Sequence, residues 1–599
     1  MQRNVSLCMI VKNEEKNLPR CLESVKDIVD EMIIVDTGSS DSTVEIAKSY
    51  GAKIINYRWD NNFSEARNES LKHATGYWIM LMDADDEFCR EDKDKLMDII
   101  NHADGEVYFL ETHSYVGNRP GTDITVNLNL RLLKNNTGYY FSNAIHEQLM
   151  NEKYDKMPGA KLPVNIGDIK VYHYGYLSEN IILKNKRVRN TEIIKKQILE
   201  EPTNPFHYFN LGSEYFADNN FKSALDAYNV VYKNFDPYTG FSSKMLVRMI
   251  LCHFYIDNFE EALKLISDSL EYYPLMTDIE YLRGMVYYRQ NRFTIAIRSF
   301  EKCMQMGEPP SELKFIGGVG TYRVYDVLTN IYMQMKDYDR AYEYAVKMLQ
   351  SRPDYIQSLY NIAHILTEQK TPIADFKKNI EVFFSNLPAQ IPFISDLFYL
   401  EGYYDVAFEY LEKYESAFKV MPEHLIYFKC KCLIALSRYE ECMEQVSRLN
   451  INDPYYFDAS MHRILCLIIL GKPDTAFELI ENFKKNRDSL TQFNRKRLAS
   501  YELLLNLSKG KLSKIKLDSE HINSLFEIVE ILFINKERYT MGLVLKLLNT
   551  SSDKMIHLRL GKLYYKYGYK KESKEELIKS IKLSDVMNKE VFQILEEIF

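Results

Sequence analysis

The chain has 599 residues, of which 46% are hydrophobic and 27% are charged. This length exceeds what a single hydrophobic core usually serves, so we expect at least two folded units, and the composition excludes a mainly disordered chain. The formal net charge of −8 argues against a general attraction to nucleic acid or to an anionic membrane.

The N-terminus and the cysteines predict a cytoplasmic protein. A strand-like apolar run, Val5–Val11, comes almost at once, without the basic segment and cleavage site of a signal peptide. No apolar run approaches the ~20 residues of a membrane span. The nine cysteines show no regular spacing, which favours reduced, mostly buried thiols.

Strand and helix signals alternate in the first part of the chain. Apolar runs predict strands at 5–11, 32–35, 53–55 and 78–82. Apolar residues at helical spacing follow the first strand, and Ser42 with Glu45 forms a capping-box pattern that would open another helix. This alternation predicts an α/β domain with a mostly parallel sheet. Ligands bind at the carboxyl ends of such strands, where Asp36 and Asp83–Asp86 stand.

Beyond about residue 200 a helical motif recurs, with an aromatic residue followed three positions later by a small one. Its clear copies are Phe221/Ala224, Phe259/Ala262, Phe293/Ala296, Tyr338/Ala341, Tyr404/Ala407 and Tyr439/Cys442, and its weaker copies are Pro473/Ala476 and Tyr539/Gly542. The spacing from Ala262 to Ala296 is 34 residues, the period of tetratricopeptide repeats. The pattern predicts an all-α solenoid, degenerate in its second half, with Gly317–Gly320 in a loop between repeats.

The acidic cluster Asp83–Asp86 directly follows an apolar strand. Side chains two apart on a strand point the same way, so the carboxylates of Asp83 and Asp85 would face one space. Two such oxygen donors, together with a diphosphate, suit Mg or Mn. The alternatives are a solvated acidic turn for the cluster and a helix cap for Asp86.

Four motifs in order resemble those of family 2 glycosyltransferases with the GT-A fold. They are Ser6–Glu15, Val35–Thr43, Phe63–Asn68 and Met82–Asp86. Two later segments, Asn143–Glu147 and Val171–Tyr176, resemble the branch that carries tetratricopeptide repeats behind the transferase, which includes peptide S-glycosyltransferases of glycosylated bacteriocins and flagellin-modifying enzymes. We therefore expect a GT-A domain over 1–178, a connecting helix over 179–202, the repeat array over 203–585 and a capping helix over 586–599.

The resemblance implies which residues bind a nucleotide-sugar donor. Together with one further candidate, Arg131, they are Asn13, Glu14, Asp36, Gly38, Arg67 and Asp83. Asp36 would bond the uracil or ribose, Arg67 would contact the nucleotide, and Arg131 would neutralise the diphosphate. Structural alternatives stay open for three of them: a turn glycine at Gly38, a surface salt bridge at Arg67 and an internal ion pair at Arg131.

The resemblance also implies a divalent cation, Mn or Mg. Asp85 would coordinate it directly, and Asp83 would contact the ribose or the metal's waters. His173 is the predicted third ligand and His146 the runner-up, with a structural histidine as the alternative for either. Glu147 is the predicted base for the acceptor, because in several GT-A relatives the catalytic base precedes the metal-binding histidine in the sequence.

The predicted function is inverting, metal-dependent transfer of a sugar from a nucleotide-sugar donor to a protein or peptide acceptor. The expected donor is a UDP-sugar. The acceptor atom would be a Ser or Thr hydroxyl or a Cys thiol, and the concave repeat surface would hold the acceptor. The alternatives are a transferase of cell-surface polysaccharide synthesis and a non-catalytic repeat scaffold. Because every donor motif precedes residue 200, we expect a chain ending there to bind the donor by itself.

Overall fold

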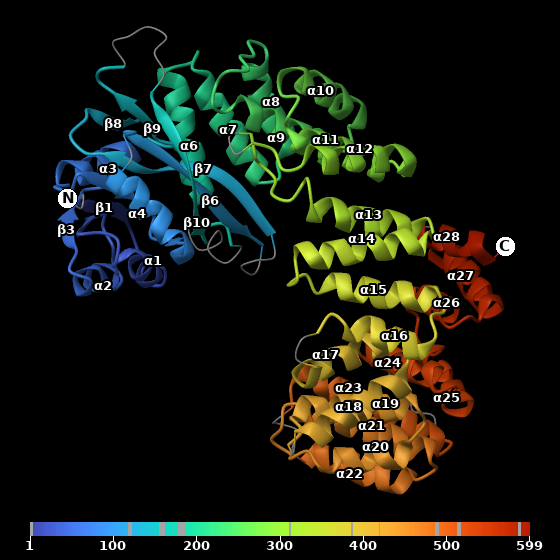
Figure 1. The fold of residues 1–599 in the computed structure, drawn as a ribbon. Helices are drawn as coiled ribbons and strands as arrows, with labels where there is room; N and C mark the ends of the chain where they lie inside the picture. The colour runs from blue at the N-terminus through green and yellow to red at the C-terminus, as the bar shows by residue number, and fades with distance from the viewer. Residues whose placement is uncertain are drawn as a thin grey trace. The chain divides into compact units, whose positions relative to one another are not determined.

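The computed structural model describes residues 4–598 except for 103, 118–122, 155–161, 178–185, 311–312, 385–386, 419, 486–489, 512–516 and 585–588. The chain forms two compact units, Met1–Ser358 and Leu359–Phe599. The first holds an α/β domain and the earlier helical repeats, and the second holds the later repeats (Figure 1). The domain boundaries predicted at 178 and 585 fall on residues outside those described.

The α/β domain is built on an eight-stranded sheet with the order β3-β2-β1-β4-β7-β6-β10-β5. Its strands are β1 (Val5–Val11), β2 (Glu31–Asp36), β3 (Lys53–Asn56), β4 (Trp78–Leu81), β5 (Asp86–Phe88), β6 (Val107–Val116), β7 (Asp123–Lys134) and β10 (Val164–His173). Its helices are α1 (Leu18–Val25), α2 (Thr43–Ser49), α3 (Phe63–Lys72) and α4 (Lys93–His102), and β8 (Tyr139–Ser142) pairs with β9 (Gln148–Asn151) in a small second sheet. The pairs among β3, β2, β1 and β4 and the β6–β10 pair are parallel, which confirms the predicted fold class.

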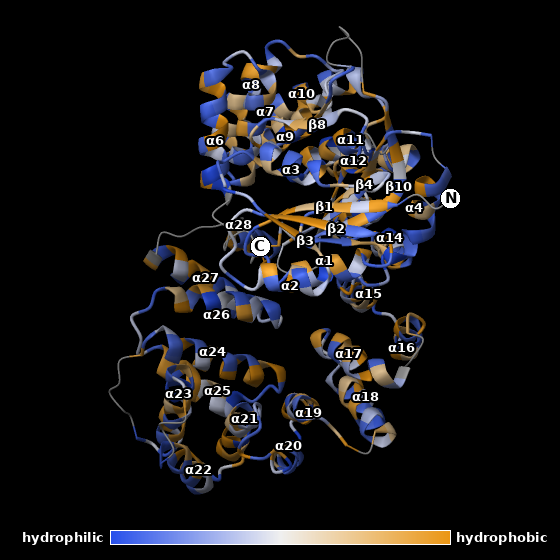
Figure 2. Cartoon of the chain, turned by 90° about the vertical axis from the view of Figure 1, so that its left-hand side faces the viewer, coloured by the Kyte–Doolittle hydropathy of each residue, from blue (hydrophilic) through white to orange (hydrophobic). Residues whose placement is uncertain are grey.

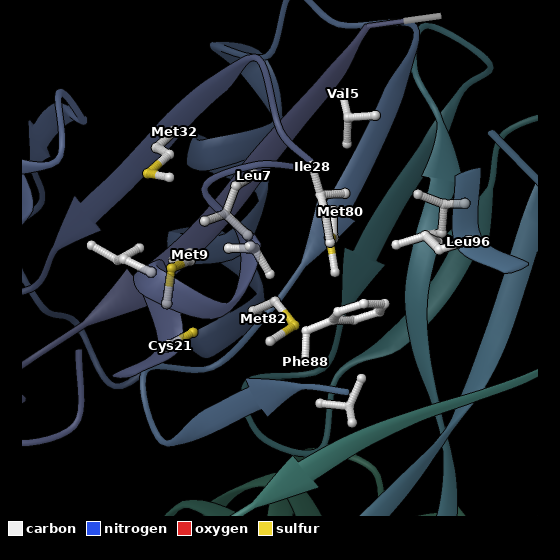
Figure 3. Packing of buried hydrophobic residues seen from close by; sticks show 14 of the residues in the cluster. Val5, Leu7, Met9, Cys21, Ile28, Met32, Met80, Met82, Phe88 and Leu96 are labelled. Carbon is white, nitrogen blue, oxygen red and sulfur yellow. The ribbon is translucent and has the colours of Figure 1, made fainter. Parts of the chain in front are cut away.

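Both faces of the central strands are buried. Along β1, Leu7 and Met9 belong to one core cluster and Cys8 to another, as the two-residue period of a strand requires. Figure 3 shows Met9, Met82 and Phe88 in the first cluster. A strand covered on both faces needs an unbroken apolar run, and β1 is accordingly coloured as hydrophobic in Figure 2.

The capping box predicted at Ser42 is wrong. Ser42 is the N-cap of α2 but makes no capping hydrogen bond with its side chain. The Oδ1 atom of Asp41 accepts from the backbone N–H of Thr43 at 3.1 Å, and Oε2 of Glu15 accepts from that of Ser42 at 3.1 Å. Glu15 thus takes the backbone N–H of Ser42 that Glu45 would have bound in a capping box, and it ties the start of α2 to the segment that follows β1.

The helical repeats begin in the first unit. Their helices there are α6 (Lys186–Glu200), α7 (Pro205–Ala217), α8 (Phe221–Tyr232), α9 (Ser242–Tyr255), α10 (Phe259–Tyr272), α11 (Thr277–Arg289), α12 (Phe293–Met306), α13 (Tyr322–Gln334) and α14 (Tyr338–Ser351). From α15 onward they continue as α15 (Gln357–Glu368), α16 (Ile373–Glu381), α17 (Leu387–Leu400), α18 (Tyr404–Ala417), α19 (Glu423–Ala435), α20 (Tyr439–Val446), α21 (Tyr456–Ile469), α22 (Pro473–Lys485), α23 (Gln492–Ser508), α24 (Ser519–Ile534), α25 (Arg538–Leu548), α26 (Met555–Lys566), α27 (Lys570–Ser584) and α28 (Lys589–Ile598).

The repeat motif read from the sequence marks the second helix of each pair. Each of the six aromatic residues in the clear copies is the first residue of a helix, and each small partner is fully buried. Close helix approach explains the small residues. At Gly284 on α11, for example, an added Cβ would lie 2.5 Å from the ring of Phe300 on α12. The predicted solenoid of helical pairs is therefore confirmed.

The glycine segment between α12 and α13 is a loop, as predicted, and it contacts the α/β domain. Ile316 forms an isolated β-bridge with Thr125 of β7. The carboxylate of Glu308 accepts from the backbone N–H groups of Gly318 at 3.1 Å and Gly320 at 3.0 Å. The extra residues in this repeat thus tie the array to the eight-stranded sheet within the first unit.

Two further observations concern the cysteines and the lengths of the helices. All nine cysteines are buried and none is in a disulfide. Within the part of the chain that the structure describes, no helix combines the length and apolar character needed to cross a bilayer.

Candidate active site

The predicted site residues meet at one edge of the sheet. Strands β2, β1 and β4 are neighbours and run parallel, so their carboxyl ends share an edge. The register places Val11 beside Asp36, and Asp83 follows the end of β4. Parallel pairing thus brings together segments that lie far apart in the sequence.

The first two motifs hold each other in place. The backbone of Asn13 is left-handed, with a φ of 55°, and its Oδ1 accepts from the backbone N–H of Ser40 at 2.8 Å. The N–H of Glu14 donates to the hydroxyl of Thr43 at 2.7 Å. Asp36 is buried, and its carboxylate accepts from the N–H of Gly38 at 3.2 Å. Gly38 itself has a φ of 103°, a conformation that favours glycine.

A cluster of two aspartates and one histidine stands at the next strand end. Antiparallel pairing of β5 with β10 sets His173 opposite Asp86. Asp85, Asp86 and His173 offer ligand atoms that all lie within 4.8 Å of one another. The Nδ1 of His173 is 2.9 Å from Oδ1 of Asp86 and 3.6 Å from Oδ1 of Asp85. The three side chains form a candidate metal site among the described residues.

Asp86 is held by an internal ion pair. Its Oδ2 lies 2.6 Å from Nη1 of Arg131, and both side chains are almost wholly buried. The same oxygen accepts from the backbone N–H of Asp83 at 2.7 Å. A carboxylate can only accept, so Nδ1 of His173 must be the donor to Asp86. Burial by itself would lower the pKa of His173, but the hydrogen bond to Asp86 and the charge of Asp85 raise it above its ordinary value.

Two of these groups converge on the same space beside Gly175. A Cβ built on Gly175 would lie 2.5 Å from Nε2 of His173 and 2.7 Å from Oδ2 of Asp85. Because Nδ1 donates to Asp86, Nε2 is the nitrogen that presents a lone pair to that space when the ring is neutral. One carboxylate oxygen and one neutral imidazole nitrogen, with a second carboxylate orienting the ring, are a donor set that fits a divalent cation.

Arg67 joins two of the other predicted residues. From α3, its Nη2 lies 3.5 Å from Oδ1 of Asp83, and its Nε lies 3.2 Å from Oε1 of Glu147. The guanidinium is largely buried, while 44% of the Asp83 side chain is exposed. Arg67 therefore bridges Asp83 and the predicted base.

His146 lies apart from the aspartate–histidine cluster. Its Nε2 is 3.7 Å from Oε1 of Glu214 on α7. The backbone of His146 is left-handed, with a φ of 54°. The structure thus sets His173 beside Asp85, and it sets His146 beside the first repeat helices.

A cavity of about 290 Å³ opens at this site, and its walls come from both the sheet and the repeats. The α/β domain contributes Asp83, Thr112, Ser114, Asn127, Asn129, Arg131, His146, His173 and Tyr176, and helices α7 and α9 contribute Phe209, Asn210, Ser213, Lys244 and Arg248. Two repeat helices therefore close one side of the cavity, although every donor motif precedes residue 200. Donor binding by a chain that ends near residue 200 stays a prediction.

The family of the α/β domain follows from a comparison with known families. Residues 6–180 match the model of glycosyl transferase family 2. This domain is a family 2 glycosyltransferase. The match covers all four motifs and also His173, and so confirms the resemblance inferred from the motifs.

Similar proteins include glycosyltransferases and a repeat protein. The SPbeta prophage-derived glycosyltransferase SunS of Bacillus subtilis is 27% identical over 374 residues, which cover 60% of this chain and 85% of SunS. A TPR repeat-containing protein of Synechococcus elongatus is 31% identical over 229 residues, 37% of this chain and 54% of that protein. An uncharacterized glycosyltransferase of Rickettsia typhi is 37% identical over 99 residues, 16% of this chain and 32% of its own length.

One of the similar solved structures is a glycosyltransferase that matches a small part of this chain. Glucosyl-3-phosphoglycerate synthase from Mycobacterium tuberculosis, in complex with Mn2+, UDP-glucose and phosphoglyceric acid, is 20% identical with a TM-score of 0.16. The overlap covers 18% of this chain and 44% of that structure.

The cavity of the glycosyltransferase domain includes residues that the sequence motifs did not indicate. Phe209, Lys244 and Arg248 lie in repeat helices, where an aromatic or basic residue is usually part of the packing or of a solvated face. Asn127 and Asn129 lie on β7 within an alternating run. The alternation of Asn127, Asn129 and Arg131 places them on one strand face and is the only sequence signal that could have indicated them.

Proposed function

We propose that this protein transfers a sugar from a nucleotide sugar, a UDP-sugar in the first instance, to an acceptor with inversion at the anomeric carbon. The observation that carries the proposal is the convergence of Asp85 with His173, which lines a polar cavity in a family 2 glycosyltransferase domain. In the reaction, the bond from C1 to the phosphate oxygen breaks and its electron pair stays on the nucleoside diphosphate. The acceptor atom bonds to C1 and its proton goes to a base.

Asp85 and His173 would hold a divalent cation, Mn or Mg, and Asp86 would orient the histidine. Such a cation, when bound, stabilises negative charge on the diphosphate. The fit rests on the converging Oδ2 and Nε2 atoms beside Gly175. Asp83 would stand beside them as a contact to the ribose or to metal-bound water. Its exposed carboxylate lines the cavity.

The remaining predicted donor-binding residues have two different roles, which their hydrogen bonds and ion pairs within the protein indicate. The loop of Asn13, Glu14, Asp36 and Gly38 would form the base pocket, and its internal hydrogen bonds would keep that pocket in shape. Arg131 forms a buried ion pair with Asp86, so we assign it to holding Asp86 and not to binding the diphosphate.

Glu147 is the proposed base for the acceptor. It follows His146, which lines the cavity, and Arg67 bonds its Oε1 at 3.2 Å. In this arrangement the arginine occupies one oxygen of the carboxylate. We therefore infer that Arg67 turns toward the donor when the donor binds, which would release Glu147 for the acceptor.

The acceptor is proposed to be a protein or peptide, modified in the cytoplasm at a hydroxyl or thiol. Stacked helical pairs give an extended concave surface, which suits a polypeptide better than a single sugar. Transfer to a cell-surface polysaccharide is the alternative. A non-catalytic scaffold is disfavoured, because Arg67, Asp83 and Asp85 are all in place at one site.

The test is incubation of the full chain with a panel of nucleotide sugars and Mn2+, with measurement of the released nucleotide. We expect slow hydrolysis of one UDP-sugar, abolished by EDTA and restored by Mn2+ or Mg2+. Intact-mass analysis of candidate proteins, peptides and glycans then identifies the acceptor class. Release from no nucleotide sugar would favour the scaffold, and full turnover in EDTA would contradict the metal site.

A further inference from the structure

Two basic side chains of the repeats line the active-site cavity. Lys244 and Arg248 lie one turn apart on α9, so they share a face of that helix. The cavity that they line also contains Asp83 and His173 of the glycosyltransferase domain. Helix α9 thus brings two cations to the place where the donor is proposed to react.

Neutral groups hold Arg248 in position. Its Nη1 donates to the hydroxyl of Ser213 at 2.6 Å. Its guanidinium lies 5.5 Å from the ring centre of Phe209 and 5.5 Å from that of Phe315. Phe315 belongs to the loop that bridges to β7. These contacts orient the guanidinium without cancelling its charge.

Lys244 has no ion pair among the residues that the structure describes. Glu214, the acidic residue of α7, is engaged with Asn190 and His146. Burial, together with the charge of Arg248, lowers the pKa of Lys244 to about 8. Two partly desolvated positive charges side by side are unfavourable until an anion joins them.

The other arginines near the donor site are already paired. Arg131 is bound to Asp86 at 2.6 Å, and Arg67 is bound to Glu147 at 3.2 Å. Carboxylates of the protein therefore largely neutralise these two charges. Among the cations that line the cavity, Lys244 and Arg248 are the ones left to meet an anionic ligand.

We propose that Lys244 and Arg248 bind the β-phosphate of the nucleoside diphosphate, so that the repeat array supplies part of the donor site. The inference rests on the proposed function and deepens it. When the bond from C1 to the phosphate oxygen breaks, its electron pair stays on that oxygen and the β-phosphate gains negative charge. Fixed cations in a partly dry cavity stabilise such charge, and they bind the leaving diphosphate more tightly than the intact donor.

The test is calorimetric titration of the full chain with UDP and with UMP in the presence of Mn2+. We expect Lys244→Gln and Arg248→Gln each to weaken UDP binding by roughly tenfold to a hundredfold, the usual value of a charge-assisted hydrogen bond. UMP lacks the β-phosphate, so its affinity should change far less. Lys244→Arg keeps the charge and should retain most of the UDP affinity.

Lys431→Gln is the matched control, since Lys431 lines a cavity in the second unit. It should leave UDP binding unchanged. Retained UMP binding by the Gln variants shows that they are folded. Wild-type UDP affinity in Lys244→Gln would overturn the inference, as would equal losses for UDP and UMP, or a loss confined to the KM of the acceptor. If the wild-type chain binds no nucleoside diphosphate of a panel, the proposed function itself fails.

Discussion

Each unit holds a cavity, and the two cavities differ in how their charged side chains are used. The second unit has a cavity of about 660 Å³ among its helices. There Arg497 pairs with Asp458 and Glu527, and Lys566 pairs with Glu530 at 2.5 Å. In the first unit, Arg248 is held by a hydroxyl and two aromatic rings.

The difference teaches how to distinguish a ligand site from internal packing. A cation that already has a carboxylate partner gains little from an anionic ligand, because it would have to exchange one partner for another. A cation held only by neutral groups keeps its attraction for an anion. The cavity of the second unit is larger and also holds a cation over aromatic rings, Lys431, but four carboxylates line it beside three basic side chains. One carboxylate and three basic side chains line the cavity of the first unit, which makes it the better place for a phosphate.

Removing a carboxylate should abolish transfer at the site of the first unit and leave transfer unchanged in the second unit. Asp85→Asn should lower transfer by roughly 10³-fold or more, because a lost metal ligand removes several kcal/mol of charge stabilisation. Asp458→Asn, in the second unit, should leave the transfer rate near that of the wild type. The measurement is product formation at saturating donor with both variants, and near-normal transfer by Asp85→Asn would show that the cluster is not the metal site.

Glu147→Gln should lower kcat by ~10²–10⁴, the usual loss for a general base, while UDP affinity stays close to the wild-type value. Glu527→Gln in the second unit is the matched control and should not change kcat. Steady-state kinetics and UDP titration separate the two effects. If Glu147→Gln turns over normally, the base is another group, or a thiolate acceptor needs no base.

Arg497→Gln should affect stability and not donor binding. The substitution leaves Asp458 and Glu527 without their cation, but both carboxylates are partly exposed, so we expect a loss of roughly 1–2 kcal/mol in the free energy of unfolding. Lys244→Gln should not destabilise the chain, because it removes a desolvated charge beside Arg248. Chemical denaturation of both variants measures the free energies of unfolding. A larger loss for Lys244→Gln than for Arg497→Gln would contradict the prediction.

The smallest expected effect is a pH dependence of UDP binding. Since the pKa of Lys244 is lowered to about 8, the side chain is charged below that pH and loses its charge as the pH rises through it. The groups that line the same cavity are Asp83, Arg131, His146, His173, Tyr176 and Arg248. Bound phosphate favours the charged lysine, so UDP affinity should fall severalfold between about pH 7.5 and 9.5.

Lys244→Arg is the control for this effect, because an arginine stays charged over that range. Its UDP affinity should be flat where that of the wild type falls. Parallel curves for the two proteins would mean that another group titrates. The titrations use UDP because its terminal phosphate has already lost its last proton at lower pH, so its charge does not change in this window.

The sequence alone determined the type and period of most elements. The run Val5–Val11 is a buried strand because both faces of β1 are covered, and apolar periodicity reports such burial directly. The aromatic residues Phe221 and Tyr439 begin helices because the repeat motif is local. Asp85 and His173 were indicated by motif order, and their pairing beside Gly175 agrees with that expectation without testing the role of either residue.

Tertiary structure decided which charges are neutralised and which groups complete the cavity. Arg131 pairs with Asp86 across 45 positions, and Arg67 with Glu147 across 80. Lys244 and Arg248 come from a repeat helix in which the sequence period indicates only packing. A periodic pattern reports which side of an element is buried, but not which distant side chain meets it. The availability of a cation for a ligand depends on that partner, so only the folded chain determines it.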